Sequence, residues 1–267
     1  MFKIIQDISR ANKKRGSSLL FGIEVEMEFS RGVDSEYISV DHFENKNDGS
    51  LRGGVEFVSE RPTDYKKAIN YVNKLYEELS QHSPIISDRT STHIHMDVRD
   101  FNRYQFAALL LLYHFYETSF LSMCEEKRHN SKYCIRGDVS YDSLKSKFDV
   151  LRDNTTSQFN SFRRSADRRY CALNVVDPVL RFGSVEFRMF EGNLDIEKFK
   201  LWLSIVNKIG LISKSCSTKR HIIYIYNWLL LHRERYFKKT FKELKYSSDC
   251  NEDALIQISD LIEEGFL

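Results

Sequence analysis

Acidic residues recur at every second position within a short apolar segment near the start of this chain. Residues 20–29 read LFGIEVEMEF, in which Glu24, Glu26 and Glu28 alternate with apolar residues. Because successive side chains of a strand point to opposite faces, the three carboxylates are expected on one face, about 7 Å apart. Such neighbours repel one another unless a cation lies among them. The segment therefore predicts a half-buried strand with a cation-binding face.

Three further segments repeat this pattern, each with apolar residues on one face and ionisable residues on the other. The ionisable residues are Glu56 within residues 55–60, His93, His95 and Asp97 within residues 91–98, and Glu186 and Arg188 within residues 184–190. Alternation of this kind is typical of strands that bury one face. The four segments together predict a sheet whose open face concentrates carboxylate, imidazole and guanidinium groups. A solvated strand face or a cross-strand ion pair would explain any one of them alone.

This combination of side chains favours divalent-metal chemistry on phosphates. Carboxylate oxygens with one or two imidazoles suit Mg²⁺ or Mn²⁺. Arg188 and a cluster of four arginines could neutralise a transferring phosphoryl group. The cluster consists of Arg163, Arg164, Arg168 and Arg169. The sequence has no Walker motif, kinase glycine-rich loop or dinucleotide fingerprint, so a nucleotide would have to bind by another architecture.

The rest of the chain predicts helices that cover the apolar side of this sheet. Residues 63–81 have an apolar stripe at helical spacing, with Thr63 or Asp64 as the cap. Residues 101–124 predict a buried helix, in which we expect His114 to be a satisfied core histidine. From residue 195 onward the chain is predicted to be helical, with Phe199 and Trp202 in the core. The elements indicate an α+β fold.

Composition sets the broad class of the protein. The chain has 267 residues, of which 42% are hydrophobic, and this composition excludes disordered and fibrous proteins. Its formal net charge of +2 does not favour nucleic acid or a membrane as a partner. The five cysteines lack a C-x-x-C pair, which argues against a disulfide framework or a cysteine-ligated zinc site and favours the cytoplasm. No segment has the pattern of a leader or a membrane span. We expect three parts, residues 1–19, 20–205 and 206–267, of which the second is catalytic and the third is a helical extension.

Four motifs, taken in order along the chain, resemble those of one enzyme superfamily. The segment from Gly22 to Glu26 resembles the G-x-E-x-E strand of the glutamine synthetase and glutamate-cysteine ligase superfamily. It is followed by a lone Glu56, an H-x-H strand at His93 and His95, and an E-x-R strand at Glu186 and Arg188. Three segments look most like the compact amidoligase branch of this superfamily: DGSLRGGVEFVSERP, HIHMDV, and SVEFRMFEGNLD, which a tryptophan-bearing helix follows. The resemblance covers roughly residues 20–205.

The resemblance implies an ATP-dependent carboxylate-amine ligase that is built on a curved antiparallel sheet with helices on one face. The substrates would be a carboxylate and an amine, each a small molecule or a peptide, and the cofactors would be ATP and Mg²⁺ or Mn²⁺. By this resemblance Glu24 and Glu26 ligate the metal, and Glu56 and Glu186 complete the metal shells. His93 would bridge a metal and the ATP phosphates. Arg188 would stabilise the transferring phosphoryl group, and Arg169 or its neighbour Arg168 would be a further arginine of the ATP site.

Several questions stay open at this level. The base that takes the proton of the amine could be Glu28, Asp97 or Asp48. A carboxylate and histidine face near arginines also suits a divalent-metal phosphoesterase or nuclease. The cluster from Arg163 to Arg169 would alternatively serve a nucleic-acid-binding module. Neither the acyl donor, the amine, the number of metal ions nor the oligomeric state follows from the sequence.

Overall fold

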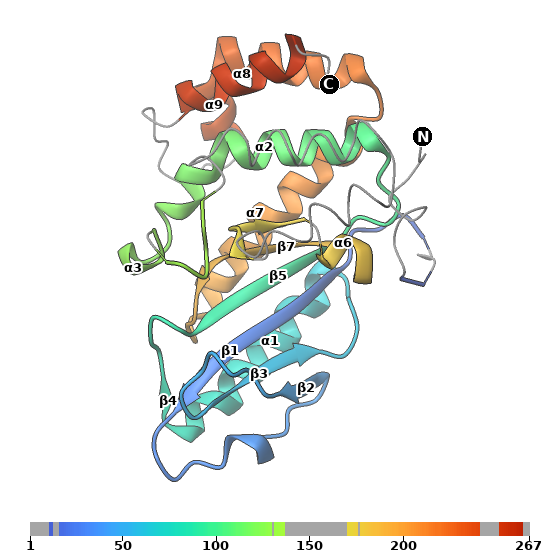
Figure 1. Ribbon diagram of the computed structural model, residues 1–267. Helices are drawn as coiled ribbons and strands as arrows, with labels where there is room; N and C mark the ends of the chain where they lie inside the picture. Colours follow the sequence, from blue (N-terminus) through green and yellow to red (C-terminus); the bar gives the residue numbers. More distant parts are fainter. Residues whose placement is uncertain are drawn as a thin grey trace.

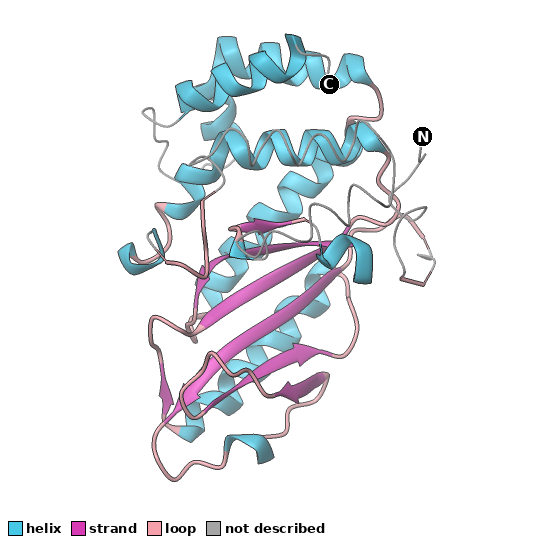
Figure 2. Cartoon of the chain, in the orientation of Figure 1, coloured by secondary structure: helices cyan, strands magenta, loops and turns pink. Residues whose placement is uncertain are grey.

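A computed structural model describes residues 11–12, 16–129, 131–136, 170–175, 177–240 and 251–263. These residues form one open antiparallel sheet of seven strands and several layers of helix (Figures 1 and 2). The predicted α+β class and the predicted antiparallel sheet are confirmed. None of the helices in the described residues combines the length and the apolar character that a membrane crossing requires.

Six strands follow one another across the sheet, and β4 pairs separately with β1. In spatial order they are β2 (Phe43–Lys46), β3 (Gly54–Ser59), β1 (Phe21–Phe29), β5 (Ser91–Asp97), β7 (Ser184–Glu191) and β6 (Leu173–Asn174), with β4 at Pro84–Ile85. All of these pairings are antiparallel. The strands predicted to carry ionisable faces, β3, β1, β5 and β7, are therefore consecutive in space.

The apolar face of the sheet carries the core. Along β1 the alternating apolar side chains from Phe21 to Phe29 are all buried, as the period-two pattern predicts. Helix α1 (Tyr65–Leu79), which Asp64 caps, and α7 (Ile196–Ser215) lie behind the sheet and cover this face (Figure 1). Phe199 and Trp202 are fully buried, and Trp202 stacks on Phe190 of β7, which confirms that both residues belong to the core.

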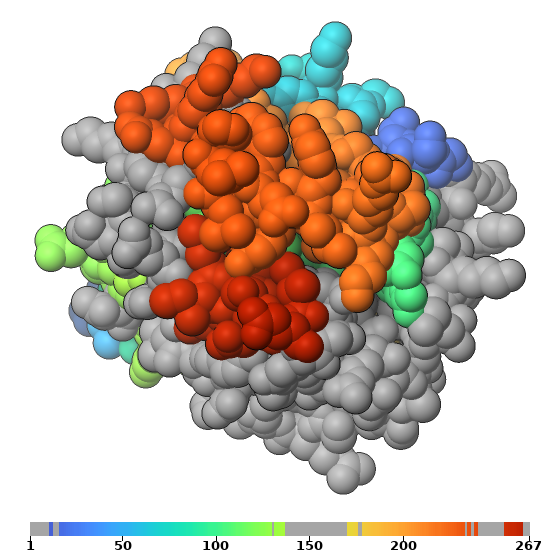
Figure 3. All heavy atoms as spheres, turned by 90° about the horizontal axis from the view of Figure 1, so that it is seen from above, coloured from blue at the N-terminus to red at the C-terminus, as the bar shows by residue number. Residues whose placement is uncertain are grey.

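A further helical layer lies beyond α7. Helix α2 (Arg103–Leu121) packs on α7 and touches the sheet where Tyr113 meets Phe187, with ring centroids 5.8 Å apart. Helices α8 (Lys219–Thr240) and α9 (Asn251–Glu263) pack on α2 and form the outer surface in Figure 3. His114 lies 2.8 Å from Gln257 of α9, through its Nε2, and is buried. The expectation of a satisfied core histidine is confirmed.

The sequence predicts turns over residues 41–54 and a strand over residues 170–176 that Pro178 ends. The structure differs from both expectations. Residues 41–54 contain β2, because Phe43 is buried and the short strand pairs with β3. The strand over residues 170–176 is reduced to β6, because residues 170–172 bond to Ile135 instead, and α6 is Asp177–Phe182. Pro178 stands in the first turn of α6, where a proline loses no helical hydrogen bond. Short helices α3 (Glu126–His129), η2 (Ser35–Tyr37) and η3 (Ser80–His82) complete the described elements.

Four of the five cysteines lie in the described part of the chain. Cys124, Cys134, Cys171 and Cys216 are free and buried. Burial raises the pKa of the Cys134 thiol to about 11. The expected division between residues 205 and 206 remains a prediction, and α7 runs across it.

Candidate metal and phosphate site

The strand registers bring the predicted acidic and imidazole residues to one place. Glu24 of β1 lies opposite His93 of β5, and Glu26 lies opposite Glu56 of β3. Across the other side of β5, His95 lies opposite Glu186 of β7. These residues line a cavity of about 300 Å³ on the face of the sheet that α1 and α7 leave open. Its lining also includes Arg188, Asp48, Ser50, Ser91, Arg89, Arg128, Arg181, Asn174, Tyr133, Tyr170, Pro178 and Phe182.

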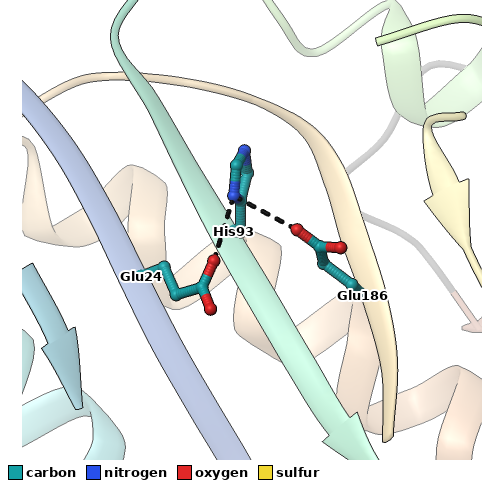
Figure 4. Close-up of side chains that lie close together, drawn as sticks. All are labelled: Glu24, His93 and Glu186. Atoms are coloured by element: carbon teal, nitrogen blue, oxygen red, sulfur yellow. Dashed lines mark hydrogen bonds and ion pairs between the residues drawn. The ribbon is translucent and has the colours of Figure 1, made fainter. Parts of the chain in front are cut away.

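His93 is the centre of this arrangement (Figure 4). Its Nδ1 atom is 3.3 Å from an oxygen of Glu24, 3.3 Å from an oxygen of Glu186 and 3.9 Å from an oxygen of Glu26. The ring is buried, and two strands, β1 and β7, supply the three carboxylates. One nitrogen therefore faces the acids of β1 and β7 at the same time.

The other nitrogen of His93 fixes the orientation of the ring. Nε2 is 2.8 Å from Ser91 Oγ, which in turn contacts Oε2 of Glu26 as its hydrogen-bond donor. Since Ser91 has one hydroxyl proton and gives it to Glu26, Nε2 of His93 is placed to donate to the Ser91 oxygen. Nδ1 then faces the carboxylate oxygens and the Arg188 guanidinium, where a ring nitrogen can ligate a cation.

Two sets of side chains offer ligand atoms that lie close enough to share an ion. Glu24, His93 and Glu186 form one set, and Glu26, Glu56 and His93 form the other, with all ligand atoms of a set within 4.8 Å of one another. Carboxylate oxygens with an imidazole nitrogen are the donors that Mg²⁺ accepts and Mn²⁺ accepts more readily. The donor set therefore fits the predicted metal, and His93 belongs to both groups.

Electrostatics within the cluster are strongly coupled. Burial alone would raise the pKa of Glu24, but His95 and His93 outweigh it and hold that pKa well below its ordinary value. Burial and the charges of Glu24 and Glu26 raise the pKa of Glu56 to about 8. Glu56 therefore holds its proton more tightly than an ordinary glutamate, because it is buried and its neighbours are also acids.

His95 takes part more directly than its sequence pattern indicates. Its Nε2 lies 3.0 Å from Glu24 Oε1, and its Nδ1 lies 3.2 Å from Ser184 Oγ. Burial would lower the pKa of His95, but Glu24 and Glu186 outweigh it and raise that pKa to about 9. His95 therefore adds positive charge on the side of Glu24 that faces away from His93.

Arg188 reaches the same cluster from β7. Its Nη1 donates to Oε1 of Glu186 and lies 3.5 Å from His93 Nδ1. Asn174 of β6 donates to the other oxygen of Glu186 at 2.7 Å. A guanidinium and an amide thus donate to the two oxygens of Glu186 and fix its orientation, as hydrogen-bond donors next to a metal ligand do.

The three candidate bases occupy different surroundings. Glu28 is buried and accepts the backbone N–H of Arg52 at 2.7 Å, and it does not line the cavity. Asp97 is held by Arg99 in an ion pair of 2.9 Å. Asp48 lines the cavity, and its charge contributes to the raised pKa of Glu56. Of the three, Asp48 is the one beside the cluster.

The sequence analysis missed some residues of the site, and some residues that it predicted lie outside the described part of the chain. Ser91 shares the face of His93 two residues along the strand, a position that the alternation could have indicated. Asn174 and Arg128 come from β6 and α3, and no local pattern points to them. Arg168 and Arg169, together with Arg163 and Arg164, lie outside the described residues. Their predicted part in an ATP site stays a prediction.

The open face of this antiparallel sheet thus gathers side chains whose atoms can ligate a metal ion. The chain belongs to the amidoligase family, because the family model described as "Putative amidoligase enzyme" matches residues 2–209. The match includes every element from which the described lining of the cavity comes. A search of curated proteins finds no match to the chain.

Proposed function

We propose that this amidoligase is an ATP-dependent carboxylate-amine ligase that forms an amide or isopeptide bond through an acyl phosphate. The observation that carries the proposal is the position of His93. His93 belongs to two groups of side chains that each offer ligand atoms for one divalent ion, and the guanidinium of Arg188 lies 3.5 Å from its Nδ1. Ligand atoms for metal ions and a phosphoryl-binding cation thus converge at one point, which is the requirement of phosphoryl transfer.

The residues that would hold the metal are those of the two groups. Glu24, Glu186 and His93 would hold one ion, and Glu26 and Glu56 would hold a second beside His93. When bound, such ions neutralise the charge of the ATP phosphates and polarise the bond to the transferred phosphoryl group. Ser91 and Asn174 keep His93 and Glu186 in their orientations.

Formal charges around the cavity fit a polyphosphate. Five carboxylates line it, from Glu24, Glu26, Asp48, Glu56 and Glu186, and so do four guanidinium groups, from Arg89, Arg128, Arg181 and Arg188. The acids outnumber the arginines by one, and His95, whose pKa is raised to about 9, balances this difference. Two divalent ions would give the loaded cavity a net positive charge, so it would attract an anion as highly charged as ATP.

In the first step, an oxygen of the substrate carboxylate attacks the γ-phosphorus of ATP, and the bond from that phosphorus to the ADP oxygen breaks. Arg188 would stabilise the charge on the transferring group, since its guanidinium already faces the acids of the cluster. In the second step, an amine attacks the acyl carbon and phosphate leaves. Asp48, which lines the cavity, is the candidate to accept the proton of the amine.

The finer description of the fold also belongs to this proposal. We infer that the open antiparallel sheet corresponds to the curved catalytic sheet of glutamine synthetase-like enzymes, because the motif order and the strand order place the same residue types side by side. The substrates would be a carboxylate and an amine, each a small molecule or a peptide.

The proposal is tested by the release of ADP and phosphate from ATP with Mg²⁺ or Mn²⁺, across a panel of amino acids, polyamines and acidic peptides. We expect turnover that needs both a carboxylate and an amine and that is lost in Glu26→Gln. The matched control is Glu36→Gln, which changes an exposed acid of η2 outside the cavity. ATP-independent cleavage of phosphodiesters, or the absence of metal-dependent ATP binding by calorimetry, would contradict the ligase.

A further inference from the structure

Arg128 is a buried arginine that takes no step in the proposed chemistry, although its charge counts toward that of the cavity. It stands on α3 and is only 2% exposed, and part of it lines the cavity. Burying a guanidinium costs free energy unless its donors find acceptors, so the hydrogen bonds of Arg128 show what the fold uses it for.

The donors of Arg128 are directed at the backbone of β7. Nη2 donates to the carbonyl oxygen of Arg188 at 2.6 Å, and Nε makes a longer contact of 3.5 Å with the carbonyl oxygen of Met189. The N–H of Arg188 in turn donates to the carbonyl of Ala172 at 2.8 Å. The backbone of Arg188 is therefore held through both its N–H and its C=O.

These two carbonyls belong to an irregularity in the sheet. Between β5 and β7 the pairing changes register, since Thr92 lies opposite Phe190 whereas Ile94 lies opposite Phe187. Two residues of β7, Arg188 and Met189, are consequently opposite the single residue His93. A bulge of this kind interrupts the ladder and re-aims a side chain. It also leaves backbone groups that another donor or acceptor must satisfy.

The bulge sets the direction of the Arg188 side chain. From this backbone position the guanidinium contacts Glu186 and lies 3.5 Å from His93 Nδ1, while its Nε is buried without a hydrogen-bond partner in the described part of the chain. We propose that Arg128 is a positioning residue that holds the β7 bulge so that Arg188 faces His93 and Glu186. The inference rests on the proposed function in so far as Arg188 binds the transferring phosphoryl group.

The geometric part is tested in the metal-free, full-length protein by ¹H–¹⁵N spectra of the His93 ring. We expect Arg128→Met to shift the His93 resonances in the same direction as Arg188→Met, and the double variant to match Arg188→Met alone. Arg128→Lys, which keeps the charge but offers a single donor head, should give a smaller shift. Unchanged His93 resonances in a folded Arg128→Met protein would overturn the inference. If that variant does not fold, Arg128→Lys and Arg128→Gln carry the same comparison.

The functional part is tested by calorimetry of ATP binding in the presence of Mn²⁺. Arg128→Met should weaken ATP binding about tenfold, the size of one charge-assisted hydrogen bond, and should change the affinity for Mn²⁺ alone by less than about twofold. In the Arg188→Met background the same change should have no further effect, because the two residues act as one unit. The control is Arg61→Met, which removes an exposed arginine outside the cavity.

Each outcome of these experiments has a separate meaning. Additive losses in the double variant would show that Arg128 does not act through Arg188. If Arg128→Met loses affinity for Mn²⁺ alone as much as for ATP, and its thermal unfolding midpoint also falls, Arg128 is only a structural residue. If the wild-type protein binds no ATP with Mn²⁺, the proposed function fails, whereas the His93 spectra still decide the role of Arg128.

Discussion

Glu24 and His93 lie directly opposite each other on β1 and β5, and Oε2 of the carboxylate is 3.3 Å from Nδ1 of the ring. Because the two residues are a cross-strand pair, the hydrogen bonds of the sheet itself set their separation. A cation bound between them would therefore meet ligands on a rigid element, which limits the conformational entropy lost on binding.

Glu24→Gln is expected to weaken Mn²⁺ binding about tenfold or more. The amide removes one negative charge and one anionic ligand from the group that contains His93 and Glu186. Calorimetric titration of Mn²⁺ into the full-length protein measures the change, with Glu36→Gln as the control for loss of an exposed acid. Equal affinities for the two variants would place the ion elsewhere.

Ser91→Ala should lower the affinity for Mn²⁺ by about tenfold without removing a ligand. The hydroxyl lies 2.8 Å from His93 Nε2 and also contacts Glu26, and loss of such an orienting partner typically costs about 10- to 100-fold in metal affinity. Ser184→Ala serves as the comparison, because its hydroxyl lies 3.2 Å from His95 rather than from His93. A larger effect of Ser184→Ala than of Ser91→Ala would reject this order of importance.

Glu56→Gln is expected to stabilise the protein in a chelating buffer. Burial and the neighbouring carboxylates raise the pKa of Glu56 to about 8, so the folded wild type binds a proton that the unfolded chain releases. Its stability therefore falls as pH rises through the interval from the ordinary glutamate pKa to about 8. The glutamine avoids this loss.

The gain from Glu56→Gln should be about 1 kcal/mol or more at pH 9 and should be small near pH 5, where the folded wild type is neutral at this position. Urea unfolding at the two pH values gives the comparison. With saturating Mg²⁺ the order should reverse, since the wild type gains more stability from bound metal. If Glu56→Gln is less stable than the wild type at pH 9 in chelator, repulsion between Glu56 and the neighbouring carboxylates does not destabilise the fold.

Gly54→Ala should destabilise the fold by about 2–4 kcal/mol. A Cβ at Gly54 would collide with the carbonyl oxygen of Met27 and come within 2.9 Å of the Cα of Glu28, both in the backbone of β1. Gly49→Ala is the matched control, because nothing lies within 4 Å of a Cβ there. Thermal unfolding compares the two, and similar midpoints would contradict the tight approach of β3 to β1.

Much of this fold could be predicted from alternation, because a strand with one buried face carries a period of two residues. Phe21 to Phe29 and Ser184 to Phe190 have that period, and both segments form strands. Strand β2 escaped because four residues around one buried phenylalanine are too few to display a period. Helix α6 was not predicted because a proline indicates the end of a strand as well as the start of a helix, and Pro178 stands in the first turn of α6.

The candidate site could be predicted to the same depth. Glu24, His93 and Glu186 each lie on the polar face of their strand. They therefore come together once β1, β5 and β7 are neighbours in the sheet. The β7 bulge could not be foreseen, since it depends on the pairing of two strands about 90 residues apart in sequence. Arg128 was equally hidden, because its partners are backbone carbonyls that leave no trace in residue types.

The helices α8 and α9 contribute no residue to the described lining of the cavity, and they follow the part of the chain that the family model matches. They contact the core through α2. A substitution on their outer faces therefore changes the surface of the molecule and leaves the ligands of the site in place.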